Sequence, residues 1–390
     1  MYPHQAERLT EALERTGLEA LVATSPANIV YVTGFRSVTD LAFRAAPLGV
    51  FSRQGAALVV PADEVAAIVA DAIDVDTIVS VGEFPEPLGE SPNAEARRIR
   101  SIVGGGAASA ADALATALER LGVRQGSIGV DQSSITHETW QRLTDRLRDV
   151  KLVPAAAALA AARRAKAPYE IECLGHALRI AEEALDVVIQ SMDRGMTERD
   201  AATAYSTEAI KRGAWPHPPV IATGERAAIP SPPPTDRAVR PGDLIRFHVG
   251  CVYKGYHASV DRTAVLGEPT PAQEVVYRAI QAGLEAAVAT FGPDTRVQRI
   301  VDAAREAVRA NGLPHYDALR VGHGIGLDPC EEPNLVAGSE TTVEMGEVLS
   351  IGACHRELGV LGAAVKDTVL VTSTSARVLN HSHRGLVVLD

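Results

Sequence analysis

Stretches with helical periodicity alternate with short apolar runs over residues 1–150. Residues 5–16 put Leu9 and Leu13 on one helical face, which predicts an amphipathic helix. Apolar runs predict strands at residues 18–24, 28–35, 48–51, 55–60, 76–81 and 127–131, with the third and fourth joined as a hairpin around Arg53, Gln54 and Gly55. This alternation of helices and strands predicts an α/β domain.

The second half of the chain has longer helical patterns and two β-rich blocks. The Ala-rich segment 154–165 predicts a domain junction, which gives domains 1–155 and 156–390. A long amphipathic helix is expected from Pro168 to about Met192, and Thr197 with Asp200 predicts a capping box for the next helix. Residues 225–241 are too rich in proline for a central strand, so an extended loop is expected there. Blocks 243–266 and 346–372 flank helical patterns at 271–290 and 296–311, which predicts an α+β domain with a sheet backed by helices.

Composition and charge narrow the class of protein. A chain of 390 residues exceeds the usual size of one hydrophobic core, and 46% hydrophobic with 22% charged residues is typical of soluble globular proteins. The 38 basic and 49 acidic residues give a formal charge of -11, and no Lys/Arg stripe is present, so nucleic acid is not an expected partner. The four cysteines are too widely spaced for a disulfide framework. Neither a signal peptide nor an apolar run of about 20 residues is evident, so we expect a cytoplasmic protein that does not enter a membrane.

Five segments in a fixed order carry a family resemblance: GDLIRFHVG, KGYHASVDRT, GHGIGLDPCEEP, VLSIGAC and VKDTVLVT. The chain resembles the pita-bread family of creatinase, prolidase and aminopeptidase P over essentially its whole length. The resemblance implies an α+β pita-bread C-terminal domain preceded by a smaller creatinase-type N-terminal α/β domain. It also implies a homodimer in which the N-terminal domain helps to close the partner's active site.

The metal-ligand positions of the family are largely rewritten. The resemblance implies Asp, Asp, His, Glu and Glu, and the matching residues here are His248, Ser259, His323, Gly352 and Lys366. Two divalent ions need several carboxylate oxygens, glycine has no side chain, and the lysine ammonium repels a cation. We therefore expect no metal and no other cofactor.

Creatinase works without metal and resembles this chain most in its logic. Its catalytic glutamate corresponds to Asp261, and its histidine in the GHGIGL motif corresponds to His323. Its other catalytic histidine falls near Ser231, and one carboxylate-binding arginine near Asn334, so creatine itself is not an expected substrate. Arg44 is a candidate for the other carboxylate-binding arginine.

Converging strands are expected to bring together the four candidate catalytic residues His323, His248, Asp261 and Lys366. The two histidines would transfer protons, Asp261 would orient or activate, and Lys366 would stabilise negative charge. Each of them could instead be a satisfied structural polar group. This set predicts a metal-independent hydrolase or lyase that breaks a C–N bond of a small, polar, carboxylate-bearing molecule.

Further residues are candidates for binding the substrate: Arg44, His217, His257, Cys330 and Glu331. Cys330 stands where the family has a second active-site histidine, and its thiol beside Glu331 is a candidate nucleophile, although buried cysteines are usually inert. His217 and His257 are expected to line the pocket.

Two other functions stay open. His248 and His323, with Asp261 or His257, are a possible ligand set for one metal ion in an Xaa-Pro peptidase-like hydrolase. The fold could also serve as a catalytically inactive scaffold or binding protein.

Overall fold

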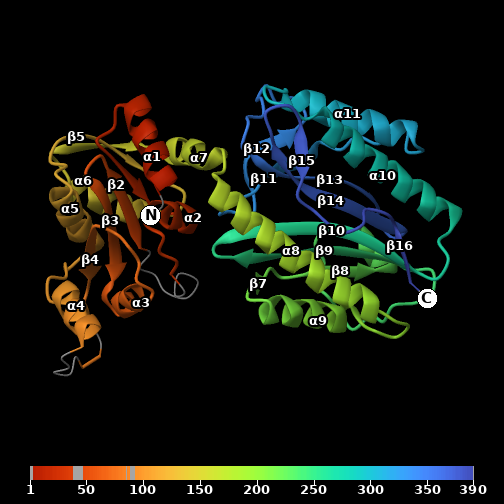
Figure 1. Cartoon of the computed structure of the whole chain (residues 1–390), viewed down its shortest axis with the longest axis horizontal. Coiled ribbons are helices and arrows are strands. Elements are labelled where there is room, and N and C mark those ends of the chain that lie inside the picture. Colours follow the sequence, from red (N-terminus) through yellow and green to blue (C-terminus); the bar gives the residue numbers. More distant parts are fainter. Residues whose placement is uncertain (1–2, 38–46, 85, 88–92, 390) are drawn as a thin grey trace. The chain divides into compact units, whose positions relative to one another are not determined.

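The computed structural model describes residues 3–37, 47–84, 86–87 and 93–389. The chain forms two compact units that divide between Arg163 and Arg164, inside the Ala-rich segment (Figure 1). Residues 156–163 therefore belong to the N-terminal unit, whereas the domain boundary expected from the sequence lies between residues 155 and 156.

The described part of the N-terminal unit is built on one six-stranded sheet in the order β4-β3-β2-β1-β5-β6. Its strands are β1 Ala20–Ala23, β2 Leu48–Ser52, β3 Gly55–Pro61, β4 Thr77–Val81, β5 Gly126–Val130 and β6 Val150–Pro154. Its helices are α1 Pro3–Thr16, α2 Pro26–Thr33, η1 Ala62–Glu64, α3 Val65–Ala70, α4 Ala94–Val103, α5 Ala110–Arg120, α6 His137–Arg146 and α7 Ala156–Arg164. The hairpin of β2 and β3 is confirmed, and the neighbouring β1–β5 and β5–β6 pairs are parallel, as in α/β folds.

The strand predicted at 28–35 is wrong, because this segment belongs to helix α2. Pro26 at the first turn favours a helix start, and Gly34, with φ of 77°, provides the left-handed residue that ends it. Nearly every residue of α2 is buried, so its apolar run is continuous and lacks the helical period. The carboxylate of Asp131 accepts hydrogen bonds from Ser25 and from Asn28, which fixes the start of the helix to the end of β5.

The C-terminal unit has a ten-stranded sheet in its described residues, with the central order β12-β11-β13-β14-β10-β9-β7. Its strands are β7 Trp215–Pro216, β8 Val220–Thr223, β9 Leu244–Tyr253, β10 Tyr256–Leu266, β11 Arg320–Gly324, β12 Glu331–Val336, β13 Val348–Glu357, β14 Leu361–Val371, β15 Ala376–Val378 and β16 Val387–Leu389. Its helices are α8 Pro168–Ser191, α9 Glu198–Lys211, η2 Gly224–Ala228, α10 Pro271–Thr290 and α11 Val297–Ala310. The four long helices and the Thr197 capping box are confirmed.

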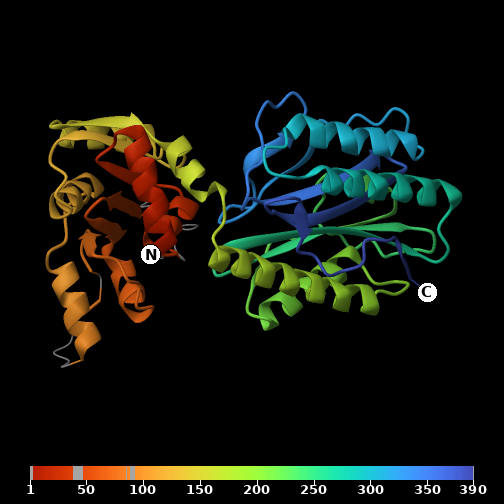
Figure 2. The ribbon, with the colours of Figure 1, turned by 45° about the horizontal axis from the view of Figure 1, so that its top comes forward.

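Two helix pairs enclose this sheet, α8 with α9 and α10 with α11 (Figure 2). On β9, Ile245 and Phe247 belong to the core shared with α8 and α9. On β14, Val365 and Val369 belong to the core shared with α10 and α11. Alternate residues of a strand point to opposite faces, so the residues between these apolar positions point away from the helices.

The face of the sheet that points away from the helices, which we call the inner face, is therefore polar. Asp261 on β10 lies directly opposite His248 on β9 and Lys366 on β14, so all three side chains emerge on this face. The helices cover the apolar positions of the sheet, and this polar face points away from them. Among the described residues no helix has the length and apolar character needed to cross a membrane.

Candidate active site

A cavity of about 370 Å³ opens on the inner face of the C-terminal unit. It is lined by residues of β9, β10, β11, β13, β14 and the proline-rich loop: Pro230, Ser231, Arg246, His248, Asp261, Arg320, Val321, Gly322, His323, Ser350, Gly352, Ala353, Cys354, Arg356, Val365 and Lys366. All four residues predicted to be catalytic line this one cavity.

Three of these residues form a hydrogen-bonded cluster. The Nδ1 atom of His248 lies 2.5 Å from Oδ1 of Asp261, and the Nζ atom of Lys366 lies 3.2 Å from the same oxygen. An ionised carboxylate only accepts hydrogen bonds, so Nδ1 of His248 carries the proton that it shares with Asp261. Among the described residues no partner of its Nε2 atom is found. The His248 side chain is 43% exposed and can reach a ligand, whereas Asp261 is buried beneath it.

The charge of Asp261 is set by its two partners. Burial alone would raise the pKa of this carboxyl group, but the Lys366 ammonium and His248 outweigh burial and hold the pKa far below its ordinary value. The side chain of the following residue, Arg262, forms an ion pair with Asp367 at 2.9 Å and not with the Asp261 carboxylate. Asp261 is therefore a permanent anion that neutralises Lys366 and orients His248.

His323 is held as a neutral imidazole. Its Nδ1 lies 2.8 Å from the carbonyl oxygen of Gly324, which can only accept, so Nδ1 carries the proton. Burial lowers the pKa of His323 to about 4, and the charges of Lys366 and Arg320 act in the same direction. At neutral pH the Nε2 atom therefore has an unprotonated lone pair.

Ser259 and Gly352 complete the rewritten ligand positions. The Lys366 ammonium donates a hydrogen bond to Oγ of Ser259 at 3.1 Å, so the serine helps to hold the ammonium in place. Gly352 lies opposite Lys366 on the neighbouring strand, and a Cβ atom there would come within 2.5 Å of the Val365 carbonyl oxygen and 2.8 Å of the Lys366 Cβ. The backbone at Gly352 is packed for a residue without a side chain.

His217 and His257 bind each other beside the cavity. Nε2 of His217 lies 2.8 Å from Nδ1 of His257, and burial lowers the pKa of both to about 4. The charges of His248 and Lys366 contribute to the lowered pKa of His217, which places the pair close to the cluster. Neither histidine is among the described residues that line the cavity, where both were expected.

Cys330 and Glu331 are engaged elsewhere. The exposed thiol of Cys330 accepts a hydrogen bond from Arg320 at 2.8 Å, and Glu331 forms a buried ion pair with Lys166 at 2.8 Å. Neither residue lines the cavity in the described part of the chain, so the Cys330 thiol is not placed to act as a nucleophile beside His323. Arg44 lies outside the described residues.

Sequence reasoning missed three arginines of the cavity wall: Arg246, Arg320 and Arg356. Arg246 donates to the carbonyl oxygens of Ala227, Ile229 and Pro230 and so ties the proline-rich loop to β9. Arg356 could have been found by counting in steps of two along its strand from Gly352, since both lie on one face.

The side chains do not fit the two metal ions that the resemblance implies. A two-metal site needs bridging carboxylates, and Asp261 is the one acidic side chain of the described cavity lining. That carboxylate is already paired with an ammonium. No group of three or more His, Cys, Asp or Glu residues in the described ranges has an arrangement that could hold a metal ion.

Comparisons with known proteins agree with this fold. Residues 172–373 match the model of metallopeptidase family M24, and residues 5–165 match the creatinase/prolidase N-terminal domain. The uncharacterized peptidase YqhT of Bacillus subtilis is 25% identical over 98% of this chain and 99% of its own length. The Xaa-Pro dipeptidase of Pyrococcus furiosus is 28% identical over 64% of this chain and 68% of its own.

The solved structure of an X-Pro aminopeptidase from Thermotoga maritima superposes with a TM-score of 0.82. It is 20% identical and covers 98% of this chain and 99% of its own, so it supports the fold alone. With a family model matching more than half of its length, the chain belongs to metallopeptidase family M24, whose pita-bread domain here follows a creatinase-type N-terminal domain.

Proposed function

We propose that the protein is a hydrolase that cleaves a C–N bond of a small, carboxylate-bearing molecule with its own side chains in place of metal ions. The observation that carries this proposal is the position of Lys366. Its ammonium lies 3.1 Å from Ser259, 3.2 Å from Asp261 and 3.3 Å from His248, among the rewritten ligand positions. A fixed positive charge there can stabilise the oxyanion that a metal ion would otherwise stabilise.

The His248–Asp261 pair supports a general-base role. Asp261 holds Nδ1 of the ring, so Nε2 is left to take a proton from water, as in other Asp–His pairs. The water oxygen then bonds to the carbonyl carbon, and the carbonyl oxygen becomes negative beside Lys366. When the C–N bond breaks, the proton passes from Nε2 to the leaving nitrogen, which yields a carboxylic acid and an amine.

His323 suits a positioning task in this scheme. Its neutral Nε2 can accept a hydrogen bond from the second proton of the attacking water. With a pKa of about 4 it is a weaker base than an ordinary histidine, so the proton transfer itself is assigned to His248.

A second candidate function comes from the relatives. Proteins named Xaa-Pro dipeptidase are similar to 64% of this chain, which favours an Xaa-Pro dipeptidase. In this chain such an enzyme would hold one metal ion. His248, His323 and Asp261 would be its ligands. The ammonium at 3.2 Å from Asp261 opposes this arrangement by charge repulsion.

Hydrolysis of a panel of Xaa-Pro dipeptides and N-acyl amino acids, with and without a chelator, tests the proposal. We expect activity that survives the chelator and incorporates oxygen from isotopically labelled water. Lys366→Met should lower kcat about 100-fold or more, which is typical for loss of an oxyanion-stabilising group. The exposed Lys151→Met is the matched control and should keep full activity.

Three outcomes would contradict the proposal: no hydrolysis of any compound, full activity in Lys366→Met, or a product without labelled oxygen. Activity that the chelator abolishes and a divalent metal restores would favour the one-metal dipeptidase instead.

A further inference from the structure

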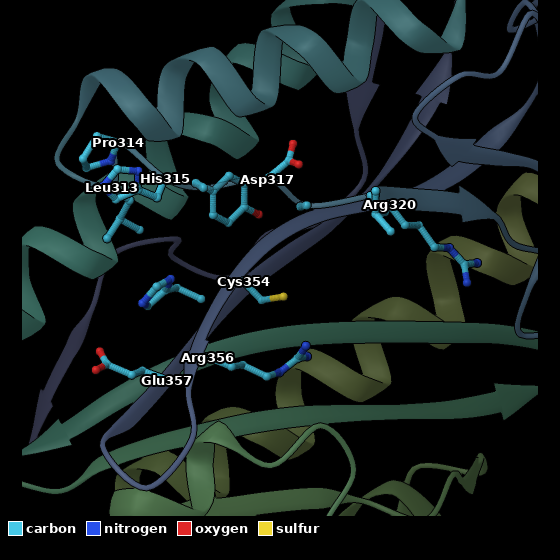
Figure 3. Close-up of a pocket in the computed structure, with 12 residues that line it drawn as sticks. Leu313, Pro314, His315, Asp317, Arg320, Cys354, Arg356 and Glu357 are labelled. Carbon is cyan, nitrogen blue, oxygen red and sulfur yellow. The ribbon is translucent and has the colours of Figure 1, made fainter.

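A second, larger cavity lies next to the candidate active site. It measures about 620 Å³ and is lined by residues 313–320 and by the end of β13, residues 354–357 (Figure 3). Arg320, Cys354 and Arg356 line both cavities, so the two spaces share a wall.

The smaller cavity has an excess of positive charge. Its described lining carries Arg246, Arg320, Arg356 and Lys366 against the single carboxylate of Asp261. Cationic walls around a cavity favour an anionic ligand. In the M24 pattern acidic side chains surround cations. In this chain the described cavity lining is mainly cationic instead.

Two of these cations have structural partners. Lys366 is paired with Asp261, and Arg246 is buried and bonded to backbone carbonyl groups. Burial and the nearby Arg356 charge both lower the pKa of Arg246, which indicates that the two guanidinium groups lie close to each other. Repulsion of this kind is relieved when an anion binds between the cations.

Arg356 differs from Lys366 and Arg246 in this respect. No hydrogen bond or ion pair of its guanidinium group is found among the described residues. Figure 3 shows its side chain extending to the same side of β13 as the Cys354 thiol, while Glu357 extends to the other side. Burial raises the pKa of the Cys354 thiol, so this neighbour is neutral and gives Arg356 no counter-charge.

Arg320 lies across the same wall. Its Nε donates to the Gly322 carbonyl oxygen at 3.2 Å and its Nη2 to the Cys330 sulfur at 2.8 Å. These two hydrogen bonds fix the guanidinium group at the first residue of β11. Both partners are uncharged, and no carboxylate is found beside the Arg320 guanidinium group in the described part of the chain.

We propose that Arg356, assisted by Arg320, binds the carboxylate of the substrate and makes the enzyme selective for free acids over their amides. This inference rests on the proposed function for the identity of the reacting bond. A guanidinium group binds a carboxylate through two parallel N–H···O bonds, which gives both affinity and orientation. The scissile C–N bond would then lie between this anchor and the Lys366 ammonium.

Calorimetric binding of N-acetylproline and of N-acetylproline amide tests the inference without requiring turnover. The native protein should bind the acid at least about 10-fold more tightly than the amide, and Arg356→Gln should remove this preference while leaving amide binding unchanged. The exposed Arg299→Gln is the control and should behave as the native protein does. With a hydrolysed acid substrate, Arg356→Gln should raise KM about 10-fold or more with little change in kcat.

Equal affinity for acid and amide in the native protein, or an unchanged preference in Arg356→Gln, would overturn the inference. Failure of the two proposals can be told apart. Acid-selective binding that depends on Arg356 in a protein without hydrolytic activity would remove the proposed function and keep this anion site. Hydrolysis that does not change in Arg356→Gln would keep the proposed function and remove this anion site.

Discussion

The Lys366 ammonium lies at a position where the pita-bread pattern has a metal-binding glutamate. In the family pattern a carboxylate lies next to a metal ion, whereas here a carboxylate lies next to an ammonium. Asp261 provides this carboxylate, two residues after Ser259, which occupies the position of the family's aspartate. A positive charge is kept at this place, but it belongs to the Lys366 side chain and not to a bound ion. Oxyanion stabilisation therefore does not require the lost ligands.

Asp261→Asn tests this exchange at the residue scale. The substitution removes both the orienting anion of His248 and the counter-charge of Lys366, so we expect kcat to fall about 10²- to 10⁴-fold. Steady-state kinetics against the exposed Asp193→Asn control measures the effect.

A double variant separates chemistry from stability. Asp261→Asn alone leaves the Lys366 charge without its partner, which lowers the free energy of unfolding. Adding Lys366→Met should recover part of this stability in urea unfolding, while activity stays lost. Unchanged kcat in Asp261→Asn would mean that the pair is only structural.

At the scale of elements, strand alternation determines which side chains meet. β9, β10, β13 and β14 each send alternate residues to the helix-covered cores and to the inner face. The small Gly352 allows β13 and β14 to approach closely beside Lys366. This packing indicates that the glutamate of the family pattern cannot simply be restored.

Gly352→Ala should lower the free energy of unfolding by about 1–3 kcal/mol, because the added Cβ meets the Val365 carbonyl oxygen at 2.5 Å. The matched control is Gly175→Ala in helix α8, where a Cβ meets nothing within 4 Å. That change should be neutral or stabilise by about 1 kcal/mol. Urea unfolding of both variants gives the comparison, and equal stabilities would show that the strands adjust freely.

Much of the element order could be predicted from the sequence. Period-3.6 patterns and capping residues located α8, α9, α10 and α11, and the order of motifs brought His248, Asp261 and Lys366 to one face. Helix α2 was missed because burial on nearly all sides removes the period on which recognition depends.

Contacts made by long side chains could not be predicted. The Lys166–Glu331 pair joins residues on separate elements, and the Arg320–Cys330 bond withdraws the thiol from the site. Side-chain direction decides both contacts, and spacing along the chain does not encode it.

At the scale of the whole molecule, the buried neutral histidines couple folding to pH. The pKa values of His217, His257 and His323 are each about 4 in the folded protein, below the ordinary value of 6.5. Between these values the unfolded chain binds protons that the folded protein does not. The free energy of unfolding should therefore fall as pH decreases from about 6.5 to about 4, and Asp261 adds a further loss below its ordinary pKa of about 3.8.

Urea unfolding over a pH series measures this dependence. Each histidine contributes a slope of at most about 1.4 kcal/mol per pH unit in this window, so His257→Gln should flatten the curve. His137→Gln, on the exposed start of α6, should leave the curve as it is. A free energy of unfolding that does not change between pH 6.5 and pH 4.5 would contradict the assigned burial.

The resemblance also leads us to propose a homodimer, with Arg44 acting across its interface. Sedimentation equilibrium should then give twice the chain mass of 41.1 kDa. A single-chain mass at all concentrations would exclude this arrangement and the proposed role of Arg44.

The central claim is that Lys366 and its partners work in place of metal ions, and the metal content of the purified protein tests it most directly. Mass spectrometry of the protein as isolated, and after dialysis against a cobalt or manganese salt, should find well below one ion per chain in both samples. One firmly held ion per chain, lost in His248→Ala and His323→Ala, would contradict the account and identify these histidines as metal ligands.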